Sequence, residues 1–211
     1  MGQRRFVFAL AGVALVALGI RSATRRPAPT RITFACQGAT RMTERILVTY
    51  AIRTGSTAEV ADAIASRLCD AGLSAEARPV TEVTSLDGYS GAVLASAVRY
   101  GSWLPEMTDF LSANRDALSA MPDAYFTMHM LALGDDPAAA AERVKYSAKA
   151  RDLITPTDEV FFEGMIDPAR LSFLDRLAVR LLKSPVGDRR DWERIGAWTD
   201  GLALRFAPEP T

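Results

Sequence analysis

Three hydroxyl side chains surround one glycine in residues 53–57, Arg-Thr-Gly-Ser-Thr. The loop follows a short apolar run at residues 45–50 and precedes an amphipathic stretch that begins at Thr57. Hydroxyl groups and free backbone N–H groups at the start of a helix bind phosphate with help from the helix dipole. A glycine also lets the backbone close around the anion. We therefore predict a phosphate site at this loop.

Three other motifs could explain the same loop: a P-loop, a dinucleotide-binding fingerprint and a helix capping box. It is not a P-loop, because no Gly-Lys-Ser/Thr follows, and it lacks the three-glycine spacing of a dinucleotide fingerprint. Ser56 and Glu59 have the spacing of a capping box, in which Ser56 caps the helix. Phosphate binding and helix capping are compatible, so both stay open.

The run Thr54-Gly55-Ser56-Thr57 resembles the second half of the Ser/Thr-x-Thr-Gly-x-Thr loop with which flavodoxins hold the phosphate of FMN. The sequence departs at Ile52, where that family has a hydroxyl. One hydrogen bond to the anion, of about 1–3 kcal/mol, is then missing, which lowers the expected affinity without abolishing the site. The resemblance implies FMN as the cofactor, with its phosphate held by Arg53, Thr54, Gly55, Ser56 and Thr57.

A second loop, residues 96–104, follows the apolar run 91–95. Its Ser-x-x-Arg-Tyr-Gly pattern resembles the flavodoxin-type, menaquinone-dependent protoporphyrinogen oxidase family, as do Met121-Pro122 and residues 188–192. In flavodoxin-like proteins this loop packs against the flavin ring. The resemblance therefore implies ring contacts from Ser96, Ala97, Val98, Arg99, Tyr100 and Gly101.

The second loop contains one base, Arg99, and no acid, whereas ordinary flavodoxins surround the ring with acidic side chains. A cation near the pyrimidine edge stabilises the reduced, anionic flavin. This charge suits an enzyme that takes two electrons from a substrate and passes them to a quinone. The alternative for Arg99 is a surface salt bridge. Tyr100 and Trp103 either stack on the flavin or cover the core.

A third loop, residues 127–133, is apolar where an electron carrier has polar residues. His129, the single histidine, titrates near neutrality and is able to relay a proton. A lone histidine is more often structural, so we assign no catalytic residue. By resemblance, ring contacts through backbone groups are expected from Thr127, Met128, His129, Met130 and Leu131.

These loops require a scaffold of alternating strands and helices, which the hydrophobic pattern supplies. The pattern predicts an α/β fold with a doubly wound sheet of five parallel strands, and the resemblance implies a flavodoxin-like sheet with the strand order 2-1-3-4-5. In such sheets the ligand binds beyond the carboxyl ends of the strands. Strands are expected at residues 45–50, 74–80, 91–95, 124–128 and 159–164, and helices at 57–71, 105–111, 137–154 and 191–206.

An extra segment, residues 165–190, separates the fifth strand from the last helix. Within it, residues 171–183 have a helical pattern with an apolar stripe and three basic side chains on another face. The helix either rests on an anionic membrane and guides a quinone to the flavin, or is a solvated helix packed on the sheet edge. The stripe comprises Leu174, Leu177, Ala178 and Leu181, and the bases are Arg176, Arg180 and Lys183.

The amino-terminal part divides into a membrane anchor or signal segment at residues 1–24 and a linker at 25–43, ahead of a flavodoxin-like domain at 44–208. The apolar run 6–20 is shorter than the roughly 20 residues of a spanning helix. Three readings stay open: an anchor, export by a twin-arginine-like signal, or translation from Met42. We expect membrane association with the folded domain on the cytoplasmic side, because arginine is slightly more abundant after the run. Export is the alternative.

Composition excludes several classes of function. The 211 residues contain 25 basic and 25 acidic side chains, but residues 1–41 hold seven arginines and no acid. The remainder has 18 bases against 25 acids, a net charge of −7, which argues against nucleic acid as a partner. One histidine and two cysteines cannot build a zinc ribbon or a disulfide framework, and we expect no metal.

Together these features predict a membrane-associated FMN oxidoreductase similar to the quinone-coupled protoporphyrinogen oxidases. Its partners would be a quinone, a porphyrinogen-type substrate and a membrane, contacted through the amino-terminal segment and the helix at 171–183. Two alternatives stay open. One is a flavodoxin-type electron carrier without its own substrate, and the other is a scaffold that has lost FMN.

Overall fold

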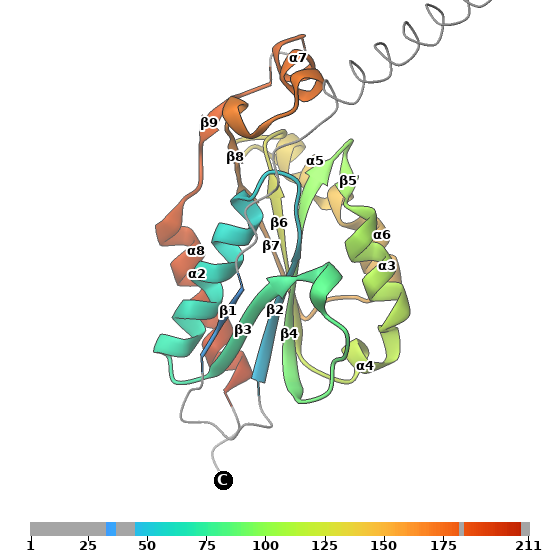
Figure 1. Ribbon diagram of the computed structural model, residues 1–211, viewed down its shortest axis with the longest axis vertical. Coiled ribbons are helices and arrows are strands. Elements are labelled where there is room, and N and C mark those ends of the chain that lie inside the picture. The colour runs from blue at the N-terminus through green and yellow to red at the C-terminus, as the bar shows by residue number, and fades with distance from the viewer. Residues whose placement is uncertain (1–32, 37–44, 182–183, 208–211) are drawn as a thin grey trace, which may run out of the picture.

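The computed structural model describes residues 33–36, 45–181 and 184–207, and Figure 1 shows their arrangement. Its main sheet has seven strands, in the order β1-β3-β2-β4-β6-β7 with β5 beside β4. The strands of this sheet are β1 (Phe34–Ala35), β2 (Arg45–Ala51), β3 (Ser74–Pro79), β4 (Tyr89–Arg99), β5 (Ser102–Trp103), β6 (Asp123–His129) and β7 (Asp158–Glu163).

Five of these strands, β3-β2-β4-β6-β7, are parallel and lie in the predicted order. The predicted strand count is wrong, because β1 and β5 are additional and pair antiparallel with β3 and β4. Each added strand has two residues, too few to produce a periodic hydrophobic pattern. The sheet is therefore mostly parallel, with short antiparallel additions.

Helices cover both faces of the sheet, as a doubly wound fold requires (Figure 1). Successive side chains of a strand point to opposite faces, and in β2 Ile46 and Val48 enter one core while Leu47 enters the other. The first core lies under α2 (Ser56–Asp70) and α8 (Trp192–Phe206). The second lies under α3 (Pro105–Ala113), α4 (Arg115–Ser119) and α6 (Ala148–Leu153), and α5 (Pro137–Tyr146) and the 3₁₀ turn η1 (Val80–Glu82) complete the layers.

The single helix predicted at residues 137–154 is wrong. The structure has two helices, α5 and α6, which meet at the fully buried Ser147. The Ser147 hydroxyl donates a hydrogen bond to Glu159 of β7, and Arg151 pairs with the same carboxylate. Because these contacts come from a distant strand, the Ala-rich pattern gave no sign of the break.

The extra segment leaves β7 and returns to α8 at the carboxyl edge of the sheet, the upper end in Figure 1. It contains β8 (Met165–Ile166), the 3₁₀ turn η2 (Pro168–Arg170), α7 (Phe173–Leu181) and β9 (Gly187–Asp188). β8 and β9 pair antiparallel, so the segment closes on itself at its base. The helix predicted at 171–183 is confirmed for the part that is described.

The amino-terminal predictions fall mostly outside the described residues, which include none of residues 1–32 and 37–44. Within the predicted linker, however, Phe34 and Ala35 form β1 against β3, so this piece is part of the domain. Cys36 and Cys69 of α2 form a disulfide with Cα atoms 6.3 Å apart. Among the described residues, no helix has the length and apolar character needed to cross a membrane.

Candidate functional site

The three loops singled out above all leave the carboxyl edge of the sheet, from β2, β4 and β6. These strands are neighbours, since β4 pairs with both β2 and β6. Parallel strands end at the same edge, so the loops converge there. The extra segment lies at the same end of the molecule (Figure 1).

The first loop delivers free amide groups to this edge. Gly55 is the N-cap residue of α2 and has a φ of 101°, a left-handed conformation that favours glycine. Because glycine has no side-chain oxygen, it leaves the first N–H groups of α2 without a side-chain cap. Ser56 is the first helical residue and not the cap, so the alternative of a capping box is wrong. Ser56 and Thr57 are buried beside these amides.

Glu59 binds two arginines of the extra segment and does not complete a capping box. Its two carboxylate oxygens accept hydrogen bonds from Arg170 Nη1 at 2.7 Å and Arg190 Nη1 at 2.5 Å. Burial opposes ionisation of Glu59, but the two guanidinium groups outweigh it and hold its pKa below the usual range. The pair of contacts ties both ends of the extra segment to the helix that begins at the phosphate loop.

Arg53 is engaged by the neighbouring helix α3. Its guanidinium lies 2.7 Å from Glu106 Oε1, donates to Oε2 at 3.0 Å and also donates to its own loop at the Ile52 carbonyl. These hydrogen bonds lower the pKa of Glu106 despite partial burial. Arg53 therefore braces the phosphate loop against α3.

The second loop is a β-hairpin, and the expectation that a loop begins at Ser96 is wrong. β4 continues to Arg99 and turns into β5 through Tyr100 and Gly101, whose φ angles of 52° and 74° suit a tight two-residue turn. Ser96 is fully buried: its hydroxyl donates to the Ala97 carbonyl and accepts from Leu104 N–H, both at 2.9 Å. Its hydroxyl thus holds the hairpin in shape.

Of the two aromatic residues in this hairpin, Trp103 belongs to the core. Its indole N–H donates to Thr127 Oγ1 at 2.8 Å, and its ring packs on Tyr125 with a centroid distance of 4.9 Å. Tyr100 is 91% exposed at the tip of the hairpin. Only Tyr100 is placed to meet a ligand from solvent.

Arg99 has an acidic partner that its own loop does not contain. Its Nη2 lies 3.2 Å from Asp175 Oδ1 of α7 and 3.3 Å from the Tyr100 hydroxyl. The acid-free surroundings expected for Arg99 are therefore wrong, because the extra segment brings a carboxylate to it. The salt bridge named as the alternative is present, and it joins α7 to the hairpin.

The third loop begins after His129 and not at Thr127, because Thr127, Met128 and His129 are buried in β6. His129 Nδ1 lies 2.8 Å from the Leu131 carbonyl oxygen, which requires a proton on Nδ1. Burial lowers the pKa of His129 and so favours the neutral ring. Arg143 of α5 donates to the Ala132 carbonyl at 2.8 Å and steadies the loop. Of the five residues expected to contact the ring, Met130 and Leu131 lie in the loop after β6.

Sequence reasoning missed the acids Glu106 and Asp175 and the arginines at both ends of the extra segment. Each contacts a residue in or next to one of the loops that is distant in the sequence, from 53 residues apart for Arg53 and Glu106 to 131 for Glu59 and Arg190. The available signal was an excess of arginine in residues 165–190, whose partners only the fold can identify.

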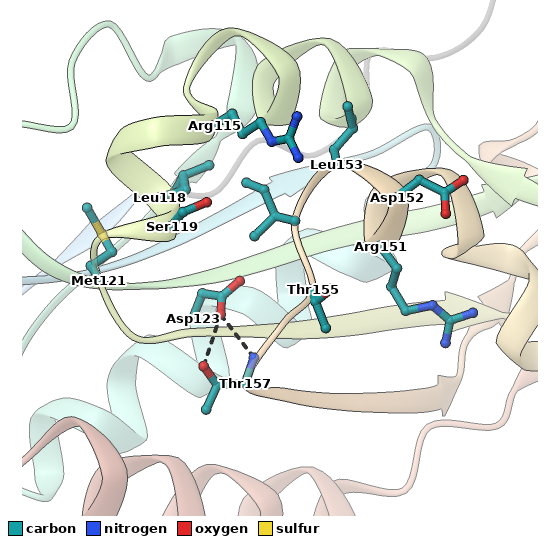
Figure 2. Close-up of a pocket in the computed structure, with 11 residues that line it drawn as sticks. Arg115, Leu118, Ser119, Met121, Asp123, Arg151, Asp152, Leu153, Thr155 and Thr157 are labelled. Carbon is teal, nitrogen blue, oxygen red and sulfur yellow. Dashed lines mark hydrogen bonds between the residues drawn. The ribbon is translucent and has the colours of Figure 1, made fainter.

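A pocket of about 310 Å³ lies elsewhere, at the amino edge of the sheet (Figure 2). Asp123, at the start of β6, accepts from Thr157 N–H at 3.0 Å and from its hydroxyl at 3.2 Å. This carboxylate joins the starts of β6 and β7. None of the predicted site residues lines the pocket, so we assign it no part in the site.

The residues at the carboxyl edge fit an FMN phosphate. A left-handed glycine, uncapped amides of α2 and two buried hydroxyls form a donor set suited to a dianion. The guanidinium of Arg53, the one cation of this loop, is engaged with Glu106. Binding at this loop would thus rest on neutral donors and the helix dipole.

Comparison with known proteins identifies the family of this chain. A protoporphyrinogen IX dehydrogenase [quinone] from Leishmania major is 25% identical, over 76% of this chain and 71% of that protein. The Escherichia coli K12 protein of the same name is 22% identical, over 74% and 88%. The solved flavodoxin of Fusobacterium nucleatum bound to flavin mononucleotide is 14% identical with a TM-score of 0.49, over 78% and 99%. Residues 47–192, well over half of the chain, match the family described as the flavodoxin domain, and the protein belongs to that family.

Proposed function

We propose that this protein is a membrane-associated, FMN-dependent oxidoreductase that passes two electrons from a porphyrinogen-type substrate to a quinone. The observation that carries the proposal is the extra segment, which is bonded to the first turn of α2, directly after the first loop, and to the β4–β5 hairpin. Arg170 and Arg190 bond it to α2, and Asp175 bonds it to the β4–β5 hairpin. The names of the two relatives support the same reaction class.

When bound, FMN supplies the two-electron chemistry, and the protein supplies binding, orientation and charge. The amides at the start of α2 bind the phosphate, with Gly55 allowing the backbone to approach it. The Arg53–Glu106 pair keeps this loop in place against α3. The β4–β5 hairpin and the loop at Met130 and Leu131 are the residues that would hold the ring.

Charge at the ring is supplied by Arg99, moderated by Asp175. A guanidinium near the flavin favours its reduced, anionic form, and the carboxylate offsets part of that effect. His129 holds its proton on Nδ1 in a hydrogen bond to the Leu131 carbonyl oxygen, so this proton maintains the loop. We assign no residue as a general acid or base.

The disulfide supports a location for the domain that differs from our first expectation. Disulfides persist in oxidising compartments and are rare in the cytoplasm. Cys36 and Cys69 are 33 residues apart and their Cα separation lies within the usual range for a disulfide. We therefore place the folded domain on the non-cytoplasmic side of the membrane, in agreement with the export alternative.

The test uses the full-length chain, purified in detergent without reductant. Its absorbance spectrum and the identity of the released chromophore report whether FMN is present. Protoporphyrinogen added without oxygen is expected to bleach the flavin, and menadione, a menaquinone analogue, is expected to restore its colour. A flavin that dithionite bleaches but protoporphyrinogen does not would favour the electron carrier. A colourless chain that rejects added FMN would favour the scaffold without cofactor.

A further inference from the structure

Helix α7 carries an apolar stripe that faces away from the protein. Phe173 is 61% exposed, Leu174 48%, Leu177 45% and Leu181 73%. A helix packed on the sheet edge, the alternative given by its pattern, would bury such a stripe against the protein. Clustered exposed apolar side chains mark a surface that contacts a partner or a membrane.

The opposite side of α7 is bonded to the protein, which fixes the direction of the stripe. Asp175 contacts Arg99 of the hairpin, and the Ser172 hydroxyl donates to Asp175 at 2.8 Å and accepts its N–H at 3.1 Å. Val179, one turn later on the same side, is half-buried. At 3.6 residues per turn, the centre of the stripe lies about 165° around the helix axis from this side. The stripe therefore faces solvent, on the side of α7 opposite its contacts with the protein.

Strand β1 enters the domain from the same end. β1 is antiparallel to β3, with Phe34 opposite Ala77 and Ala35 opposite Glu76. Since β3 ends at the carboxyl edge, the chain comes from that edge at residue 33 and runs down to Cys36. The disulfide to Cys69 holds this direction. Only residues 21–32 separate the apolar run 6–20 from that point.

The charges beside the stripe indicate the kind of surface it meets. Arg176 and Arg180 are exposed and lie one turn apart next to the stripe. An apolar face bordered by arginines is typical of helices that lie in the interface of an anionic bilayer.

We propose that the carboxyl edge docks on an anionic lipid bilayer through α7. The apolar stripe of Phe173, Leu174, Leu177 and Leu181 enters the interface, and Arg176 and Arg180 contact the lipid head groups. Docking in this orientation does not depend on FMN or on catalysis. Access of a membrane quinone to the site is its consequence and rests on the proposed function.

A depth-sensitive fluorophore tests this orientation in the full-length chain. NBD is attached to the single new thiol of Leu177→Cys, without reductant, so that the native cysteines stay paired. The matched control is Leu204→Cys, another exposed helical leucine, 81% exposed near the end of α8 at the amino edge (Figure 1). Vesicles of equal parts phosphatidylglycerol and phosphatidylcholine are expected to raise the Leu177 signal several-fold with a blue shift. The Leu204 signal should stay that of an aqueous probe.

Charge is tested with Arg176→Glu and Arg180→Glu together in the labelled Leu177→Cys chain. Loss of each arginine costs about a factor of five, so the docked-to-undocked ratio should fall by at least roughly 25-fold on anionic vesicles, and the added negative charges lower it further. An equal signal on pure phosphatidylcholine would overturn the requirement for anionic lipid. Circular dichroism of each labelled variant confirms that the fold is retained.

Two outcomes overturn the docking itself. In the first, the chain floats with vesicles while both probes stay aqueous, so that the amino-terminal segment binds lipid without the α7 face. In the second, the Leu177 probe already emits as in an apolar environment without lipid, and its fluorescence does not change when vesicles are added. Another part of the chain or a second copy then covers the stripe. Neither outcome affects the flavin spectrum, so failure of docking is distinguishable from failure of the proposed function.

Discussion

Arg99 of the β4–β5 hairpin and Asp175 of α7 are 76 residues apart in sequence, yet Arg99 Nη2 lies 3.2 Å from Asp175 Oδ1. This pair bonds the extra segment to the loop that resembles a flavin-ring loop. It also pairs the cation of that loop with an acid, so the charge presented to a bound flavin depends on both residues.

Replacement of Asp175 by Asn should raise the two-electron potential of the bound flavin. Removing the carboxylate leaves Arg99 less neutralised, which favours the reduced, anionic flavin. The expected shift is on the order of 10–30 mV, equivalent to about 0.5–1.4 kcal/mol for two electrons. Redox titration of the holoprotein measures it. Ser172→Ala, which removes the hydroxyl contact to Asp175 and keeps the charge, is the control, and a lowered or unchanged potential in Asp175→Asn would contradict the assignment.

Gly55→Ala should weaken FMN binding by about tenfold while leaving riboflavin binding much less affected. Its φ of 101° strains any residue with a Cβ by roughly 1–2 kcal/mol, and relief of that strain distorts the phosphate loop. Gly72→Ala is the matched control, because Gly72 has a φ of 88° just beyond the other end of α2. Fluorescence titration measures both ligands. Equal losses of FMN affinity in the two variants would show that the effect is general strain.

Cys36→Ser combined with Cys69→Ser should lower the free energy of unfolding by about 3 kcal/mol. The disulfide closes a loop across a sequence separation of 33 residues and so restricts the unfolded chain. Urea unfolding of the variant and of the wild type, with and without reductant, measures the change. The reduced wild type serves as its own control and should match the variant. If the oxidised protein is no more stable than the variant, the bond does not form or does not contribute.

Stability should fall between pH 7 and pH 5 partly through His129. Burial lowers the pKa of this residue in the folded state, so the unfolded chain takes up a proton first, near its ordinary pKa of about 6.5. The His129 contribution is thus present above that pH and is lost as pH falls toward the folded pKa. His129→Asn retains a donor for the Leu131 carbonyl and does not titrate. Urea unfolding at each pH should give a shallower loss for the variant than for the wild type, and parallel curves would refute the assignment.

The sequence by itself determined the parallel sheet and the places where its loops leave it. Runs such as residues 45–50 and 91–95 are apolar because they are buried on both faces, and this local property is readable without coordinates. The order of the five parallel strands followed from the resemblance carried by Thr54-Gly55-Ser56-Thr57. The same local logic located Gly55, since a hydroxyl cluster between a strand and a helix needs no distant partner.

Only the tertiary structure decided which charges act together. Glu59 has the spacing of a capping box, but its carboxylate accepts hydrogen bonds from Arg170 and Arg190. Arg99 forms an ion pair with Asp175. Likewise β1 and the break at Ser147 depend on contacts with other elements, whereas β5 is a two-residue hairpin strand too short to produce a pattern. A hydrophobic pattern reports whether each residue is buried, which is a property of one position. An ion pair or a short added strand is a relation between two distant positions, and it exists only once the chain has brought them together.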